Sequence, residues 1–202
     1  MDEKALIDMA LEGDMNAFNH LVLAYQDMAF NTAYRIMSDG PAAEDATQEA
    51  FISMYQKLHT YHGGSFKAWL LRIVTNACYD ELRRRKRRPT VALEPETDEG
   101  DFIESPSWLE DDAPKPDEAL NNSELEKALQ HCIQALDEKY RAVVVLVDVA
   151  GEDYESVAAI IHSPIGTVKS RLARARQKLQ HCLQGFWELL PANFRLLDVE
   201  GK

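Results

Sequence analysis

The sequence predicts an all-α protein of two small helical domains joined by an acidic flexible linker. Apolar residues recur at helical spacing through residues 1–88 and again through residues 118–186. The segment between them, residues 89–117, holds five of the eight prolines and ten acidic side chains against one lysine, a composition typical of extended chain. The 202 residues with 46% hydrophobic content are enough for two packed cores.

Four helices are predicted in the first domain. They span Lys4–Leu11, Met15–Met37, Pro41–Leu58 and Phe66 to Arg88. Asp14 is expected to cap the second helix, and the break at 38–41 separates it from the third. The loop 59–65 holds two glycines and Tyr61, whose ring offers a face to an unstacked base. A plain connecting loop is the alternative.

The third predicted helix carries one polar, acidic face. Its members follow one another at i, i+1, i+4 and i+5, and they are Glu44, Asp45, Gln48 and Glu49. The buried side is expected to consist of Phe51, Met54, Tyr55 and Leu58. An acidic patch of this kind suits a basic partner surface, although a solvated helix face is also compatible with it.

The fourth predicted helix ends in an unbroken run of six cationic residues, from Arg83 to Arg88. A helix dipole favours cations in the last turn, but six exceed what it can use. The run therefore indicates contact with nucleic-acid phosphates. About five such contacts on duplex DNA would give a log–log salt slope near −4.5.

The second domain is predicted to end in a helix-turn-helix. Residues 153–161 form the first helix and residues 162–164 the turn, with Ser163 as the cap of the second helix. The second helix has an apolar stripe at Val168, Leu172, Ala175 and Leu179. Five cations and no acid lie between Lys169 and Lys178, which suggests phosphate and base-edge contacts.

Two earlier segments complete the second domain. Apolar residues at 125, 129, 133 and 136 set one helix stripe. The run Val143–Val147 has strand-like propensity, but we predict a helix because a lone strand between helices would have no partner.

The charge of the chain is unevenly distributed. The net charge is −12, but residues 90–118 hold eleven acids against Lys115 alone, or −10, which leaves −2 for the remainder. The bulk value therefore does not exclude nucleic acid as a partner.

Composition also bounds the compartment and the cofactors. No apolar run is long enough for a bilayer and no signal pattern begins the chain, so a cytoplasmic protein without membrane insertion is expected. The three scattered cysteines fit a reducing cytoplasm better than a disulfide framework. His131–Cys132 and His181–Cys182 are adjacent pairs whose side chains diverge on a helix, so neither a metal site nor any other cofactor is predicted.

Three motifs in order give the chain a family resemblance. They are Ala43-Glu44-Asp45 with Gln48-Glu49-Ala50-Phe51, then residues 66–73 with Asn76 and Asp80, then residues 166–172. Together they resemble the extracytoplasmic-function (ECF) sigma factors, the two-domain promoter-specificity subunits of bacterial RNA polymerase. The resemblance implies a region 2-like domain at 1–88, a linker at 89–117, a region 4-like domain at 118–186 and a tail at 187–202.

The resemblance also implies partners and sites. Core RNA polymerase would be bound through the clamp of its largest subunit, by Glu44, Asp45, Gln48 and Glu49, and through the flap of its second subunit. The −10 promoter element would contact Tyr61, Asn76, Arg83, Arg84, Arg85 and Arg87. The −35 element would contact Thr167, Lys169, Ser170, Arg171, Arg174 and Arg176. An anti-sigma factor is a further expected partner, and no enzymatic activity is implied.

A stand-alone regulator and an enzyme are the two alternative classes of function. A stand-alone helix-turn-helix regulator would use residues 1–88 for sensing or dimerisation and would bind a palindromic site without polymerase. An enzyme would have to use His59, His62 and nearby acids, but no nucleophile–base spacing or phosphate loop supports it. The acidic helix and the arginine-ended helix favour the sigma factor, since a dimerisation domain needs neither.

Overall fold

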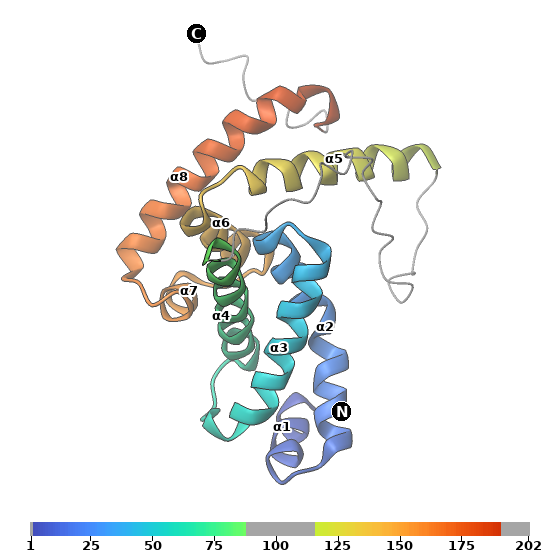
Figure 1. The fold of residues 1–202 in the computed structure, drawn as a ribbon, viewed down its shortest axis with the longest axis vertical. Helices are drawn as coiled ribbons and strands as arrows, with labels where there is room; N and C mark the ends of the chain where they lie inside the picture. The colour runs from blue at the N-terminus through green and yellow to red at the C-terminus, as the bar shows by residue number, and fades with distance from the viewer. Residues whose placement is uncertain (1, 88–115, 191–202) are drawn as a thin grey trace.

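The computed structural model of the chain describes residues 2–87 and 116–190. Within the second range, it describes only the backbone of residues 116–123. Every regular element in these ranges is helical, as predicted (Figure 1). In the first domain they are α1 (Glu3–Leu11), α2 (Met15–Met37), α3 (Gly40–Lys57), η1 (Leu58–Thr60) and α4 (Phe66–Arg87). In the second they are α5 (Pro116–Gln134), α6 (Glu138–Val144), η2 (Val145–Val149), α7 (Tyr154–Ile160), α8 (Ile165–Leu183) and η3 (Gln184–Leu189).

The predicted linker and tail lie mostly outside the described residues. Of the linker, only its last two positions are described, and there α5 already begins at Pro116. Of the predicted tail, residues 187–190 are described, and η3 takes up most of them.

Helices α2, α3 and α4 form the first bundle, and α1 packs against α2 (Figure 1). Alanines supply much of the buried surface of α2 and α3, because a methyl side chain lets two helix backbones approach closely. They are Ala29, Ala33, Ala43, Ala46 and Ala50, all at most 3% exposed. Larger side chains from α4 complete the core, including the fully buried Phe66, Leu70 and Leu71.

Two aspartates begin the helices of this bundle. The Asp14 carboxylate accepts hydrogen bonds from the backbone N–H groups of Asn16 at 2.8 Å and Ala17 at 3.2 Å, which confirms the predicted cap. Asp39 accepts from the N–H of Ala42 at 2.8 Å. This second cap starts α3 at Gly40, one residue before the predicted start.

We expect Asp39→Ala to destabilise the protein by about 1–2 kcal/mol, because the cap of α3 is lost together with an ion pair to Arg85. The hydrogen bond from Arg85 holds the Asp39 pKa below its usual value. A lowered folded-state pKa means that the ion pair stabilises the fold above the unfolded pKa of about 3.9 and is lost as the pH falls through the lower folded value. Urea unfolding at neutral and acid pH measures this.

Asp39→Asn is the matched control for this substitution. Asparagine keeps the capping oxygen but cannot form the ion pair, so it should lose only the acid-sensitive part of the stability. Equal damage from both variants at neutral pH would show that the cap contributes nothing.

The second bundle has its core at the junction of α6, η2, α7 and α8. The predicted helical conformation of Val143–Val147 is confirmed, since α6 continues into the π-helical turn η2. Val143, Val145, Leu146 and Val157 are buried there with no exposed surface. Together α6 and η2 bring Val143, Val145 and Leu146 into one core, and a helix satisfies its own backbone where a strand would need a partner strand.

The turn of the helix-turn-helix differs in detail from the prediction. Asp153 caps α7 by accepting from the N–H of Ser156 at 2.7 Å. Helix α8 begins at Ile165 after Pro164 and has no side-chain cap, so the predicted capping role of Ser163 is wrong. Ser163 instead donates to the Ile161 carbonyl at 3.3 Å, and His162 takes a left-handed conformation with φ of 49°. The helix also extends to Leu183, four residues beyond its predicted apolar stripe.

The two bundles contact each other at the end of α2 (Figure 1). Helix α2 ends at Ser38 in a left-handed conformation, which leaves carbonyls without intrahelical partners. Side chains of the second domain satisfy them. Arg141 donates to the Ile36 carbonyl at 2.7 Å, and Gln134 donates to the Ser38 carbonyl at 3.1 Å.

A second contact lies along α4. Lys67 forms an ion pair with Glu152 at 3.2 Å and also donates to the Ala150 carbonyl. The Glu152 side chain is only 7% exposed, so this pair is shielded from solvent on one side. Near the other end of α4, Lys86 pairs with Glu138 at 2.8 Å. The two domains are therefore joined by polar contacts at three places in this structure.

We expect Arg141→Met to weaken the contact between the domains. Arg141 is half-buried and also donates to the carbonyls of Gln134 and Leu136, so its loss leaves several helix-end acceptors without a donor. An unsatisfied buried acceptor costs about 1–3 kcal/mol. Small-angle scattering should record a larger radius of gyration. Lys139→Met on the same helix, where the side chain is exposed, should leave it unchanged; an equal effect from both variants would contradict the assignment.

Candidate functional site

The predicted acidic face forms on α3 as the sequence analysis expected. Glu44, Asp45, Gln48 and Glu49 are all exposed, because the alanines of α3, which recur at helical spacing, face inward. No pairing partner is recorded for these carboxylates in the described part of the chain, so their charge is directed to solvent. The face is available to a partner of opposite charge.

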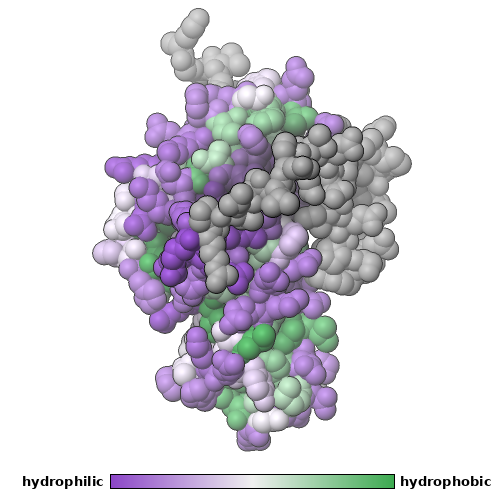
Figure 2. Space-filling model, viewed as in Figure 1, coloured by the Kyte–Doolittle hydropathy of each residue, from purple (hydrophilic) through white to green (hydrophobic). Residues whose placement is uncertain are grey.

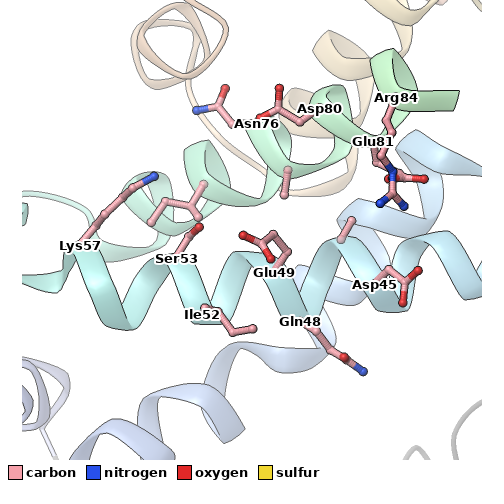
Figure 3. A pocket seen from close by; sticks show the side chains of 13 residues that line it. Asp45, Gln48, Glu49, Ile52, Ser53, Lys57, Asn76, Asp80, Glu81 and Arg84 are labelled. Carbon is pink, nitrogen blue, oxygen red and sulfur yellow. The ribbon is translucent and has the colours of Figure 1, made fainter. Parts of the chain in front are cut away.

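Part of this face borders a groove of about 570 Å³ between α3 and α4. Asp45, Gln48 and Glu49 line it from α3, with Ile52, Ser53 and Lys57 further along the helix. Figure 3 shows Glu49 directed from α3 toward α4, whereas Gln48 points away from α4.

Helix α4 contributes Asn76, Asp80, Glu81 and Arg84 to the same groove (Figure 3). The structure thus brings together residues that the sequence analysis assigned to two different partners. Asp45 and Glu49 were assigned to the polymerase clamp, and Asn76 and Arg84 to DNA. Four carboxylates and two cations line the groove, so its lining is acidic overall.

The lower end of the acidic face is apolar, and the sequence analysis missed this. Tyr55 was expected to be buried, but it is 54% exposed and Ile52 is 52% exposed. The prediction for Tyr55 was wrong because Met54 and Leu58 already fill the core side of the helix. The Tyr55 ring packs edge-on against Phe18 at 5.1 Å. Figure 2 shows apolar surface, in green, among the polar surface of the lower part of the molecule, where α1, α2 and α3 lie.

Helix α8 separates its cations from its core contacts. Val168, Leu172 and Ala175 are buried, and Leu179 is half-buried, as predicted. The opposite side presents Lys169, Ser170, Ala173, Arg174 and Gln177, all exposed. Small side chains at 170 and 173 let the backbone of this side approach a groove of DNA closely.

Comparison with known proteins identifies both domains. Residues 21–88 match Sigma-70 region 2, and residues 126–179 match Sigma-70, region 4. The chain is 34% identical over 183 residues to RNA polymerase sigma-H factor of Pseudomonas aeruginosa, covering 90% of this chain and 94% of the relative. It is 32% identical to ECF RNA polymerase sigma-E factor of Escherichia coli, covering 91% and 95% of the two chains. The chain belongs to the ECF sigma factors.

Solved structures of sigma factors have the same fold. The sigma factor RpoE, solved in complex with the anti-sigma factor NepR from Bartonella quintana, superposes with a TM-score of 0.63. The two are 28% identical, and the match covers 83% of this chain and 96% of that one. CnrH, solved with the cytosolic domain of CnrY, matches with the same TM-score at 22% identity over 91% and 97% of the two chains, which supports the fold.

In the region 2 domain of this sigma factor, the cationic run on α4 is largely paired. Arg83 contacts Asp80 at 2.6 Å and Arg84 contacts Glu81 at 2.7 Å. Arg87 donates to the Arg83 carbonyl at 3.4 Å. From the sequence these cations were predicted to contact phosphates, and the pairing with Asp80 and Glu81 one turn earlier was not foreseen. The Arg83–Asp80 pair is exposed on both sides, and such a pair is worth under about 1 kcal/mol, so a phosphate can replace its carboxylate.

Arg85 is held more firmly than its neighbours. It contacts Asp39 at 3.0 Å and Glu81 at 3.0 Å, and these two hydrogen bonds raise the Arg85 pKa. Since Asp39 also caps α3, Arg85 fixes the end of α4 against the start of α3. Arg85 is therefore a structural contact between α3 and α4 and not a free cation.

Tyr61 and Asn76 do not share a pocket. Tyr61 is half-buried and contacts the rings of Phe66 at 5.3 Å and Trp69 at 5.6 Å. Its hydroxyl donates to the Gly64 carbonyl at 2.7 Å, which fixes the loop. Asn76 lies about three turns further along α4, exposed at the groove. Burial raises the Tyr61 pKa.

In region 4, the six predicted −35 residues divide into two sets. Lys169, Ser170 and Arg174 are on the exposed side of α8, and Thr167 lies half-buried in its first turn. Arg174 hydrogen-bonds to the Tyr140 hydroxyl, which lowers the Tyr140 pKa. Lys169 lies over the Tyr154 ring at 5.7 Å.

Arg171 and Arg176 form the other set, beside the apolar stripe. Arg176 makes a bidentate contact with Asp148 of η2, at 3.0 and 2.5 Å. Arg171 is half-buried, contacts Ser163 at 3.5 Å, and lies close enough to Tyr79 of region 2 to act on its pKa, which burial raises overall. A bidentate arginine–carboxylate pair fixes orientation, so Arg176 positions α8 on the core of region 4.

The cysteines differ from their prediction. Cys132 of α5 and Cys182 of α8 form a disulfide with a Cα–Cα distance of 5.7 Å, and Cys78 is free and buried. The expectation of three separate thiols failed because sequence spacing does not reveal which helices meet. His131 packs against Phe186 at 5.8 Å. Within residues 2–87 and 116–190, no cluster of three or more His, Cys, Asp or Glu side chains is arranged to hold a metal ion.

None of the described helices is both long and apolar enough to span a bilayer.

Proposed function

We propose that this sigma factor binds core RNA polymerase through α3 and directs initiation at promoters that α4 and α8 contact. One observation carries the proposal. An acidic and apolar face on α3 and a cationic face on α8 lie on separate helices, in a chain that its sigma-factor relatives match over nearly their whole length. Separate faces of opposite charge suit two different partners, a protein surface and DNA.

The polymerase-binding face comprises the four predicted residues of α3 extended by Ile52 and Tyr55. The acidic upper part suits a basic partner helix and gives orientation and fast encounter. The exposed isoleucine and tyrosine supply the apolar contact area on which affinity depends. The clamp of the largest polymerase subunit is the partner that we assign to this face, and the flap of the second subunit is assigned to region 4.

The −10 surface is assigned to α4 and the loop before it. Arg83, Arg84 and Arg87 are exposed and exchange their carboxylate or carbonyl partners for phosphates. Asn76 is exposed on the same helix, and the aromatic cluster around Tyr61 holds the loop 59–65 in a fixed conformation. Arg85 is assigned to support of this surface rather than to contact with DNA.

The −35 surface is assigned to the exposed side of α8. Thr167, Lys169, Ser170 and Arg174 lie in its first three turns, the part of a recognition helix that enters the major groove. Arg171 and Arg176 are assigned to positioning of the helix, because their contacts point toward the core of the domain.

An anti-sigma factor is the further partner that we propose. The sigma factor RpoE, which superposes on this chain with a TM-score of 0.63, was solved in complex with the anti-sigma factor NepR. Because a sigma factor acts on polymerase at the bacterial chromosome, we assign this protein to the cytoplasm. Within this family no enzymatic activity is part of the proposed role.

The decisive experiment is transcription in vitro with core polymerase on genomic fragments, with and without this protein. Promoter-specific transcripts that appear only when it is added are expected. Failure to associate with core polymerase would overturn the proposal. Specific binding of the free protein to a palindromic duplex would instead support a stand-alone helix-turn-helix regulator, an alternative that the full-length match to sigma factors does not favour.

A further inference from the structure

The disulfide of region 4 is unexpected in the cytoplasm to which we assign this sigma factor. Cytosolic proteins rarely keep structural disulfides, because glutathione and thioredoxin reduce them. Where such bonds occur there, they are usually transient, catalytic or redox-sensing. The pair therefore has to be explained as a reversible state rather than as a permanent cross-link.

The two cysteines belong to helices that meet only in the folded domain. Cys132 lies in the last turns of α5 and Cys182 in the last turn of α8, with 50 positions between them in sequence. Their Cα–Cα distance of 5.7 Å is within the range that a disulfide spans without backbone movement. The folded backbone thus places the two sulfur atoms within bonding reach.

The two thiols differ in access to solvent. Cys132 is 1% exposed, whereas Cys182 is half-buried. An oxidant in solution therefore reaches Cys182 first, and Cys132 is placed to react with the product. Cys78 is fully buried in region 2, and burial raises its pKa to about 12, so it provides an unreactive internal reference.

The disulfide joins α5 to the last turns of α8, which have few other contacts with the core. Beyond Ala175, no described side chain of α8 is fully buried. Two partly exposed ion pairs hold the following turns, Arg176 with Asp148 and Lys178 with Asp137. Such pairs are individually weak. A covalent tie to the buried Cys132 therefore changes how firmly the end of the recognition helix is held.

Helix α5 gives the tie a second connection. Gln130 and Gln134, two residues to either side of Cys132, donate to Ser38 at the end of α2. In the oxidised form, the recognition helix is linked covalently to the helix that contacts region 2. In the reduced form, this link depends on packing alone.

We propose that Cys132 and Cys182 are a reversible thiol-oxidation site that fastens the end of the recognition helix to α5. Hydrogen peroxide oxidises the Cys182 thiol to a sulfenic acid and is itself reduced to water. The Cys132 sulfur then attacks the Cys182 sulfur, the S–S bond forms, and the sulfenic oxygen leaves as a second water. Two molecules of glutathione reverse the reaction, and each gives up one hydrogen as they form glutathione disulfide.

The rate of this reaction is set by the position of the thiols. Both lie at carboxyl ends of helices, where the partial negative charge of the helix does not favour a thiolate. Oxidation is therefore slow, over minutes to hours, and reports sustained oxidising conditions rather than a short pulse.

The test uses the full-length purified protein, without polymerase or promoter, so its outcome is independent of the proposed function. The protein is reduced, treated with hydrogen peroxide, and alkylated before and after denaturation, and the peptides are identified by mass spectrometry. The expected result is a linkage between Cys132 and Cys182 within one chain, with Cys78 alkylated only after denaturation. Reduced glutathione should remove the linkage.

The mechanical consequence is measured on the same samples. Oxidation should raise the Tm by at least about 5 °C, because it closes a loop of about 50 residues. Hydrogen exchange should slow in residues 176–190 and stay unchanged in α2 and α3. Cys182→Ser should abolish the Tm shift and Cys78→Ala should retain it.

Several outcomes would overturn the site. They are thiols that both remain free after peroxide, a linkage between two chains, a glutathione adduct on Cys182 that Cys132 does not displace, or a Tm that is identical in both redox forms. The oxidised and reduced forms of the native chain are compared directly, so the result does not depend on whether either variant folds.

Discussion

Reversing two charges on α3 should abolish binding to core RNA polymerase. We expect Asp45→Lys with Glu49→Lys to weaken association at least about 100-fold, because like charges brought together across an interface cost several kcal/mol. Both side chains are exposed and border the groove between α3 and α4, so the substitutions need not disturb the core. Anisotropy of a labelled sigma factor titrated with core polymerase measures the effect.

Asp8→Lys is the matched control for the charge reversal. Asp8 is an exposed acid of the same domain, but it lies on α1 and away from the groove. It changes the net charge in the same direction and should leave polymerase binding near its original value. If all reversals weaken binding in proportion to net charge, the docking face is not on α3.

A further contrast separates the apolar part of the face from the acidic part. Tyr55→Ala should weaken polymerase binding mainly through faster dissociation, since exposed aromatic residues act as anchors. The charge reversals should act strongly on the association rate, and their effect should shrink at higher salt.

Replacing Arg174 should weaken promoter binding, whereas replacing Arg176 should slightly lower the stability of the fold. Arg174→Ala should weaken binding to the −35 element by about 1–3 kcal/mol if the guanidinium contacts a base. The Arg174 side chain is exposed on the outer side of α8, and its recorded partner is the Tyr140 hydroxyl. Electrophoretic mobility shifts of the holoenzyme on wild-type and mutated −35 sequences give the measurement.

Arg176→Ala supplies the comparison within the same helix. Arg176 contacts Asp148 through two hydrogen bonds, so its loss should lower the Tm and leave base preference at the −35 element unchanged. Asp148→Asn should reproduce the loss of stability without touching α8. If Arg176→Ala instead relaxed base preference, its assignment as a positioning residue would be wrong.

Local chemistry determines most of the fold. Three correct predictions depend only on neighbours within one or two turns. They are the cap at Asp14, the helical conformation of Val143–Val147 and the buried stripe of α8. Those interactions are readable from spacing, because residues three or four positions apart share a helix face. The exposed acidic face of α3 followed for the same reason, since alanines occupy its inner side.

Other features depended on residues far apart in the chain. Tyr55 and Leu58 were both expected to be buried, yet only Leu58 is, because Met54 and Leu58 already fill the core side of this end of α3. Arg85 and Asp39 are separated by 46 positions, and their contact turned an expected phosphate ligand into a support for α3. Nothing in the local pattern distinguishes Arg85 from Arg84.

By itself, the sequence determined the helices, the segregation of positive from negative surface, and the class of protein that such an arrangement serves. Tertiary structure alone decided that Arg85 and Arg176 pair with distant acids, which apolar side chains remain exposed, and that Cys132 meets Cys182. The physical reason is the distance along the chain over which each interaction acts. Helix propensity and amphipathic spacing act over a few residues, whereas ion pairs, burial and disulfides depend on where distant segments come to rest.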